Sequence, residues 1–183
     1  MIIIGITGTL GAGKGTVVHY LEENGFKHFS SRGFIVEELK KRDLPINRTE
    51  MAKVANQLRA ERGPAYIVEA MYDKAAKQSK ATIESIRNPG EVLALRQKKN
   101  FYLLSVDADP KLRYERIIKR GSVTDGVSFE KFIGDEEKEM HSDDPHKQNI
   151  ARCMAMADFK LYNNGTVEQL HNQIEDILKS IKV

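Results

Sequence analysis

Hydrophobic residues recur along this chain in two patterns, as short unbroken runs and at positions spaced three or four apart. The run MIIIGIT (1–7) is mostly β-branched, which predicts a strand buried on both faces of a parallel sheet. NFYLLSVDA (100–108) predicts a second strand of this kind. Three shorter segments predict further strands, namely FKHFSS (26–31), KATIESI (80–86) and MADFKLYNN (156–164).

Helical periodicity fills the segments between the predicted strands, most extensively from about residue 31 to 79. NPGE (88–91) supplies a capping asparagine, a proline at the first helical position and a glutamate where a capping box places it. DP (109–110) and TVEQ (166–169) begin helices by similar capping signals. Strands that alternate with helices predict an α/β fold, with a five-stranded parallel sheet flanked by helices.

Composition narrows the class of protein without changing this fold. A chain of 183 residues fits a single domain spanning 1–183. The 29 basic and 26 acidic residues give a net charge of +3, which makes no strong case for a nucleic-acid partner. The single Cys153 cannot form an internal disulfide, and no apolar stretch has membrane length. We therefore expect a cytoplasmic protein without a membrane partner, and the sequence indicates no oligomeric state.

The segment GTLGAGKGT (8–16) lies between the first strand and the helix that follows it. The spacing of Gly8, four residues, and then Gly13 and Lys14 meets the phosphate-loop pattern in the strand–loop–helix context that it requires. Glycines let several backbone N–H groups face one hollow, the helix start adds its positive dipole end, and the lysine adds a full charge. The segment therefore predicts a polyphosphate site.

The loop departs from the strict pattern, which has Ser or Thr directly after the lysine, because Gly15 comes first and Thr16 second. This GKGT variant resembles the loop of the nucleoside monophosphate kinases, the adenylate kinase group. The resemblance implies ATP as the donor and Mg²⁺ held largely through water, with Thr16 bonding a phosphate oxygen. It assigns the donor to the loop residues Gly8, Gly11, Ala12, Gly13, Lys14, Gly15 and Thr16.

A second match to that family lies at the end of the third predicted strand, where IESIR supplies Glu84 and Arg87. The resemblance implies that Glu84 orients magnesium-bound water and that Arg87 grips the phosphate of the acceptor. The family favours Asp where this chain has Glu84, so a solvated strand end is the alternative interpretation. Ser30 and Arg32 lie where the family binds the acceptor monophosphate, within or beside an acceptor-binding insertion of about 31–79.

The third match is a row of arginines in DPKLRYERIIKRG (109–121), where Arg113, Arg116 and Arg120 fall on one helical face. Three neighbouring cations repel one another, and an anion between them would relieve that repulsion. In the family, arginines at the mouth of a lid stabilise the phosphoryl group in transit, and Arg116 and Arg120 match that place best. A solvated basic face is the alternative. The polar, glycine-spaced segment 121–148 is the predicted lid.

The resemblance covers nearly the whole chain and extends to the dephospho-CoA kinases. It implies a P-loop kinase fold and a loop near Asn164 and Gly165 that lies against the base of the donor. We expect ATP-dependent phosphoryl transfer to a small-molecule nucleotide, a nucleoside monophosphate. The dephospho-CoA kinases carry an aspartate after the second strand, whereas SSRGF (30–34) has no acid there, although Glu84 could replace it. A non-catalytic nucleotide-binding switch is the other alternative.

Overall fold

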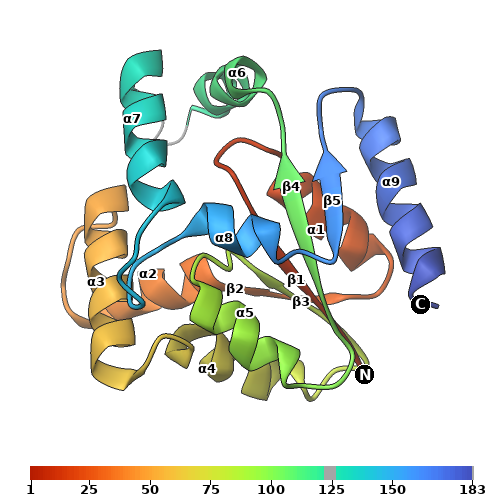
Figure 1. Cartoon of the computed structure of the whole chain (residues 1–183), viewed down its shortest axis with the longest axis horizontal. Coiled ribbons are helices and arrows are strands. Elements are labelled where there is room, and N and C mark those ends of the chain that lie inside the picture. The colour runs from red at the N-terminus through yellow and green to blue at the C-terminus, as the bar shows by residue number, and fades with distance from the viewer. Residues whose placement is uncertain (122–126, 183) are drawn as a thin grey trace.

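The computed structural model describes residues 1–121 and 127–182, and Figure 1 shows a central sheet with helices on both faces. The elements follow one another as β1 (Ile2–Gly8), α1 (Lys14–Glu23), β2 (Lys27–Ser30), α2 (Ser31–Lys41), α3 (Arg48–Arg62), α4 (Tyr66–Ala75), β3 (Lys80–Glu84), α5 (Pro89–Arg96), β4 (Phe101–Asp107), α6 (Pro110–Arg120), α7 (Phe129–Met140), α8 (Ile150–Ala155), β5 (Phe159–Tyr162) and α9 (Val167–Ser180).

The sheet contains five parallel strands in the order β2-β3-β1-β4-β5, which confirms the predicted fold class. β1 lies in the middle, and its register pairs Ile6 with Glu84 of β3. Ser30 of β2 also pairs with Glu84. Since the carboxyl ends of parallel strands meet at one edge, the loop after Gly8 lies beside Glu84 and Ser30.

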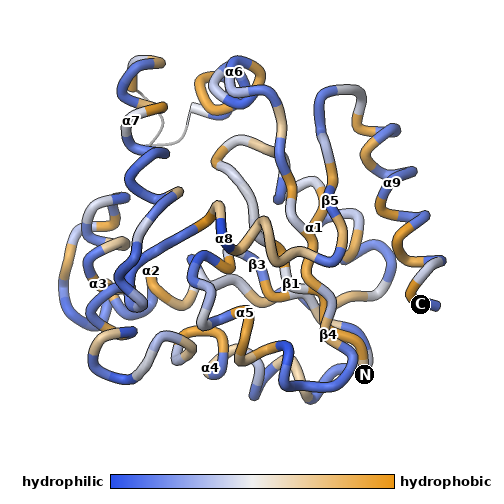
Figure 2. Tube along the Cα trace, in the orientation of Figure 1, coloured by the Kyte–Doolittle hydropathy of each residue, from blue (hydrophilic) through white to orange (hydrophobic). Residues whose placement is uncertain are grey.

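Alternation along β1 divides the core into two clusters, one on each face of the sheet. Ile3 packs into the cluster that α2, α3, α4, α5 and α8 cover, whereas Ile4 and Ile6 face α1 and α9. All three side chains are at most 1% exposed. Figure 2 shows this hydrophobic centre against largely hydrophilic outer helices. The burial of β1 on both faces explains its unbroken apolar run.

The predicted helix starts are confirmed by their hydrogen bonds. The side chain of Asn88 caps α5, and the carboxylate of Glu91 accepts a hydrogen bond from the Asn88 amide at 3.1 Å. Thr166 and Gln169 form the same reciprocal pair at the start of α9. Asp109 caps α6 through the amide of Lys111. These local interactions determine where each helix begins after its strand.

The predicted lid, 121–148, includes residues 122–126, which lie outside the described part of the chain. Its helix α7 packs more closely than its polar sequence suggested. Phe132 is 1% exposed and contacts the rings of Tyr114 and Phe129, with centroids 5.7 and 6.3 Å away. Within the described ranges, no helix has the length and hydrophobicity to cross a membrane.

Candidate active site

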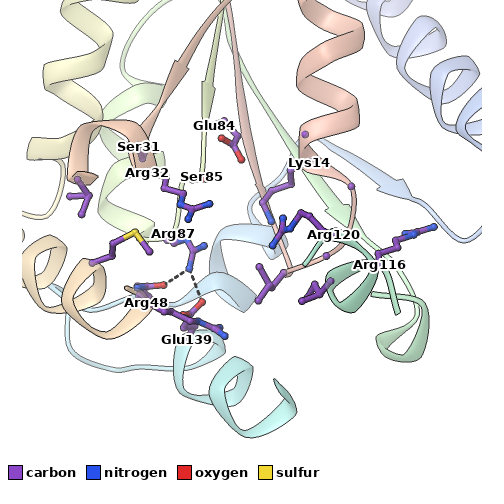
Figure 3. Close-up of a pocket in the computed structure, with 18 of the residues that line it drawn as sticks. Lys14, Ser31, Arg32, Arg48, Glu84, Ser85, Arg87, Arg116, Arg120 and Glu139 are labelled. Atoms are coloured by element: carbon purple, nitrogen blue, oxygen red, sulfur yellow. Dashed lines mark hydrogen bonds and ion pairs between the residues drawn. The ribbon is translucent and has the colours of Figure 1, made fainter. Parts of the chain in front are cut away.

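A cavity of about 610 Å³ lies at the carboxyl edge of the sheet, a volume typical of small-molecule sites. Its walls come from the β1–α1 loop, α2, α3, the segment after β3, α6, α7 and the loop after β5 (Figure 3). It brings together many of the residues that the sequence predicted, namely Gly11, Gly13, Lys14, Gly15, Thr16, Arg32, Glu84, Arg87, Arg116, Arg120 and Gly165.

The β1–α1 loop follows a path that only glycine adopts readily. Gly8, Gly11 and Gly13 have φ angles of 134°, 78° and 100°. A Cβ atom on Gly8 would lie 2.0 Å from the carbonyl oxygen of Val106. Gly8 and Ala12 do not line the cavity, and Ala12 is fully buried. These two residues therefore shape the loop, while its remaining predicted members face the cavity.

Lys14 extends from the start of α1 back along its own loop. Its Nζ donates to the carbonyl oxygens of Gly8 at 2.9 Å and Thr9 at 2.7 Å. Burial lowers the pKa of Lys14 to about 8, and the positive charge of Arg87 adds to that decrease. The carboxylate of Glu84 opposes it. The ammonium group is thus held in an electropositive cavity that an anion would stabilise.

Glu84 ends β3 and lines the cavity close to Lys14 (Figure 3). Its Oε2 lies 3.5 Å from His28 Nε2 and accepts a hydrogen bond from Ser30 Oγ at 3.4 Å. Burial raises the pKa of Glu84, but the neighbouring His28 and the charge of Lys14 outweigh it, so the pKa lies below its usual value. Glu84 is therefore an ionised carboxylate in the cavity wall.

At the start of α2 the residue that lines the cavity lies one position after the predicted Ser30. Ser30 caps α2 by accepting from the amide of Gly33 at 3.2 Å, and it does not line the cavity. Ser31 lines it instead, with a buried hydroxyl that has no partner among the described residues. The capping role of Ser30 turns its side chain along the helix start. Arg32 lines the cavity and is exposed.

Arg87 follows β3 and lines the same cavity. It has two hydrogen-bond partners that the sequence did not indicate. Its Nη1 donates to Glu139 Oε2 at 2.6 Å and to Gln148 Oε1 at 3.0 Å. Arg48 donates from Nε to the other oxygen of Glu139 at 2.8 Å. No local motif marks Arg48 or Glu139, because they are 91 positions apart in the chain.

The three arginines of α6 do not act as one group. Arg113 is 3% exposed, pairs with Glu136 through both terminal nitrogens and donates to the carbonyl oxygen of Leu10 at 3.2 Å. The expected anion among all three arginines is therefore wrong for Arg113. Arg116 and Arg120 line the cavity. In Figure 3 Arg120 points toward Lys14, whereas Arg116 points to the opposite side.

The loop after β5 closes the side of the cavity near Arg116. Arg116 Nη2 donates to the carbonyl oxygen of Asn163 at 2.9 Å, and Asn163 Nδ2 donates to that of Ala12 at 2.9 Å. Gly165 lines the cavity. Asn164 does not, and its Oδ1 accepts from the amide of Asp109 at 2.8 Å. This loop is thereby tied directly to the phosphate loop.

The end of the cavity near α2, α3 and α4 has a different chemistry. Its floor is apolar, and three arginines, Arg32, Arg48 and Arg87, stand around it. Such a combination suits a ligand with an apolar or aromatic body and an anionic group. The apolar residues are Ile35, Met51, Ala52, Ala55 and Ile67.

The residues expected to hold magnesium fit that ion only through water. Thr16 and Glu84 line the cavity, and they offer two kinds of oxygen ligand, a hydroxyl and a carboxylate. Mg²⁺ prefers oxygen ligands and keeps several of its waters, so two side chains with a bound triphosphate suffice. In residues 1–121 and 127–182, no group of three or more His, Cys, Asp or Glu side chains could hold a metal.

Comparisons with known proteins agree with this architecture. A family described as an AAA domain matches residues 4–142. A UPF0200 protein of Thermococcus kodakarensis is 30% identical over 188 residues, covering 99% of this chain and 98% of its own. A UPF0200 protein of Methanocaldococcus jannaschii is 30% identical over 189 residues, covering 99% and 91%.

Two solved kinases show the same fold. The shikimate kinase of Bacteroides thetaiotaomicron superposes with a TM-score of 0.60 at 13% identity, covering all of this chain and 99% of its own. The dephospho-CoA kinase of Campylobacter jejuni superposes with a TM-score of 0.52 at 16% identity, covering 98% and 96%. The expected P-loop kinase fold is thereby confirmed.

Proposed function

Because this chain belongs to the UPF0200 family and carries the AAA domain of P-loop proteins, we propose that it is an ATP-dependent phosphotransferase. Its acceptor in this proposal is a small molecule that already carries a phosphate, a nucleoside monophosphate. The observation that carries the proposal is the division of one cavity into two ends of different chemistry. A phosphate loop with Lys14 forms one end, and arginines around an apolar floor form the other.

Phosphoryl transfer requires alignment and charge compensation more than covalent chemistry. An oxygen of the acceptor's phosphate attacks the γ-phosphorus of ATP, the bond from that phosphorus to the bridging oxygen breaks, and ADP leaves. In this proposal Lys14 and the loop amides hold the donor's phosphates, and Arg120 covers the group in transit. Arg87 and Arg48 hold the acceptor. The acceptor oxygen is already ionised, so the reaction needs no general base.

The donor end supports further assignments of roles. Arg116 lies beside the loop after β5, so we assign it to the donor's base side, together with Gly165. Thr16 would bond a phosphate oxygen, and Thr16 with Glu84 would hold the hydrated Mg²⁺. That ion supplies positive charge to the donor's phosphates when it is bound. In this proposal α7 belongs to the lid of about 121–148, and the segment of about 31–79 forms the acceptor-binding insertion.

A coupled assay for ADP release, run with ATP and each nucleoside monophosphate in turn, tests the proposal. We expect release that depends on one class of monophosphate. Lys14→Ala should lower that rate at least about a hundredfold, because it removes the charge at the phosphates. The control Lys40→Ala replaces an exposed lysine of α2 and should leave the rate of ADP release unchanged. Full transfer by Lys14→Ala would refute the proposed role of this lysine.

Phosphoryl transfer to a sugar hydroxyl, as in the dephospho-CoA kinases, is a second candidate that one observation favours. Glu84 is an ionised carboxylate in the cavity wall, and a carboxylate can accept the proton of an attacking hydroxyl. Dephospho-CoA therefore belongs in the acceptor panel, together with shikimate as an acceptor whose hydroxyl is on a carbon ring and not on a sugar. ADP release with one of them, lost in Glu84→Gln, would favour this candidate. Nucleotide binding without any release would favour a non-catalytic switch.

A further inference from the structure

Glu139 of α7 reaches from the predicted lid into the acceptor end of the cavity. Each of its two carboxylate oxygens accepts a hydrogen bond from a different arginine, Oε2 from Arg87 at 2.6 Å and Oε1 from Arg48 at 2.8 Å. Figure 3 shows its carboxylate beneath Arg87. The Glu139 side chain is 14% exposed, whereas Arg48 and Arg87 are 27% and 30% exposed and line the cavity.

Two guanidinium groups that converge on one pair of oxygens form an arrangement suited to phosphate. Arginine presents several N–H donors in a fixed fork, and it binds carboxylates and phosphates through the same geometry. Arg48 begins α3 and Arg87 follows β3, so two separate elements supply the donors. The Glu139 carboxylate therefore occupies donors that a phosphate ligand would use.

The charges at this place favour a competition between anions. Glu139 is ionised, because the charge of Arg87 and the hydrogen bond from Arg48 outweigh the effect of burial and keep its pKa below the usual value. It neutralises part of a cluster of cations that also includes Arg32. A phosphate dianion carries a larger charge and one more acceptor oxygen, so it can replace a single carboxylate.

α7 has contacts with the rest of the protein besides those of Glu139. Phe132 of the same helix is buried against Tyr114 and Phe129, and Glu136 pairs with Arg113. These contacts attach the helix to α6. The interaction of Glu139 with the cavity is therefore additional to those that hold the helix.

We propose that Glu139 is an internal competitor for the acceptor's phosphate, occupying Arg48 and Arg87 until a phosphorylated ligand displaces it. This inference rests on the proposed function, because it takes the arginine end of the cavity as the acceptor site. Glu139 sets the affinity for the acceptor and discriminates against molecules without an anionic group, since these cannot replace the carboxylate. Displacement also frees α7 from the acceptor end, so acceptor binding is coupled to the position of this helix.

Isothermal titration calorimetry with inorganic phosphate tests the inference without any need for catalysis. We expect Glu139→Gln to bind phosphate roughly tenfold to a hundredfold more tightly than the wild type, because charge-assisted hydrogen bonds no longer have to be exchanged. Glu137→Gln removes the same charge from an exposed position of α7 and should leave the affinity unchanged. Equal affinities for the two variants would overturn the inference.

Phosphate can also bind at the phosphate loop, so a second substitution must show that the gain in phosphate affinity arises at Arg48 and Arg87. Adding Arg87→Ala to Glu139→Gln should abolish the gain, and a gain that persists would overturn the inference. Glu139→Asp withdraws the carboxylate by one methylene and should give a smaller gain, several-fold. Melting curves accompany each variant. If Glu139→Gln and Glu139→Asp both fail to fold while Glu137→Gln folds, the carboxylate is structural and the inference is wrong.

The ADP-release assay separates this inference from the proposed function. A lower KM for the monophosphate in Glu139→Gln than in Glu137→Gln supports both. If Glu139→Gln binds phosphate more tightly but no variant phosphorylates an acceptor, the result supports the competition by Glu139 and contradicts the proposed kinase activity. Transfer with the same KM in both variants supports the kinase and contradicts the competition.

Discussion

At the scale of single residues, Lys14 shows how the cavity is prepared for an anion. Its ammonium group donates to two loop carbonyls, but its burial and the nearby Arg87 disfavour the charge and lower its pKa to about 8. A bound triphosphate would reverse this effect, because it places negative charge beside the ammonium group. The charge of Lys14 in the free protein is thus pH-dependent in a range that experiments can reach.

We expect the affinity for ATP to fall above pH 8. Below that pH the lysine is already charged, whereas above it the free protein must take up a proton to bind, which costs up to about tenfold in affinity per pH unit. Titrations between pH 7.5 and 9.5 measure this, together with proton uptake in buffers of different ionisation enthalpy. Lys14→Arg should bind with little pH dependence, because a guanidinium does not titrate there. A flat wild-type profile would contradict the expectation.

At the scale of elements, the phosphate loop contains glycines of two kinds. Gly8 is required by the backbone, since its φ is 134° and a Cβ would collide with β4. Gly15 lies in the first turn of α1, has ordinary helical conformation, and a Cβ there would meet nothing within 4 Å. The packing therefore does not require glycine at position 15, although this residue lines the cavity.

Two alanine substitutions should separate these kinds of glycine. Gly8→Ala should lower the free energy of unfolding by about 3 kcal/mol or more, because the loop or β4 must shift. Gly15→Ala should raise it by roughly 0.5–1 kcal/mol, because alanine favours the helix. Urea denaturation measures both values, and ATP titrations of Gly15→Ala show whether the added methyl group obstructs the donor. Similar stabilities for the two variants would refute this distinction.

At the scale of the whole molecule, one buried ion pair joins α3 to α5, the helix that follows β3. Arg59 of α3 is 3% exposed and donates to Glu91 Oε1 from Nε at 3.0 Å and Nη2 at 2.8 Å. The other oxygen of Glu91 accepts from the amides of Arg87 and Asn88. The position of α3 is therefore linked to the backbone that carries Arg87.

Removing one partner of this pair should be costly. Arg59→Leu leaves the buried carboxylate of Glu91 without its counter-charge, and the free energy of unfolding should fall by about 3–5 kcal/mol. Arg62→Leu removes only exposed contacts of the same helix with Tyr66 and should lower it by about 1 kcal/mol at most. Chemical denaturation provides the comparison. If Arg59→Leu is as stable as Arg62→Leu, the pair does not hold α3 to α5.

Most of the fold and the phosphate loop that lines one end of the cavity could be predicted from short stretches of sequence. The caps at Asn88 and Thr166 depend on residues three positions away, and the phosphate loop is a motif of nine residues. The acceptor end was predicted less fully. Ser31 lines the cavity in place of Ser30, because the helix cap occupies Ser30. Arg113 belongs to the protein interior, because Glu136 neutralises it.

The sequence by itself determined the order of strands and helices, the loop of glycines and the lysine that finishes it. Each of these follows from backbone conformation or from side chains a few positions apart. The tertiary structure alone decided which cations face the cavity and which anions meet them. Glu139 reaches Arg87 across 52 positions and Arg48 across 91, and only the path of the whole chain brings such charges together.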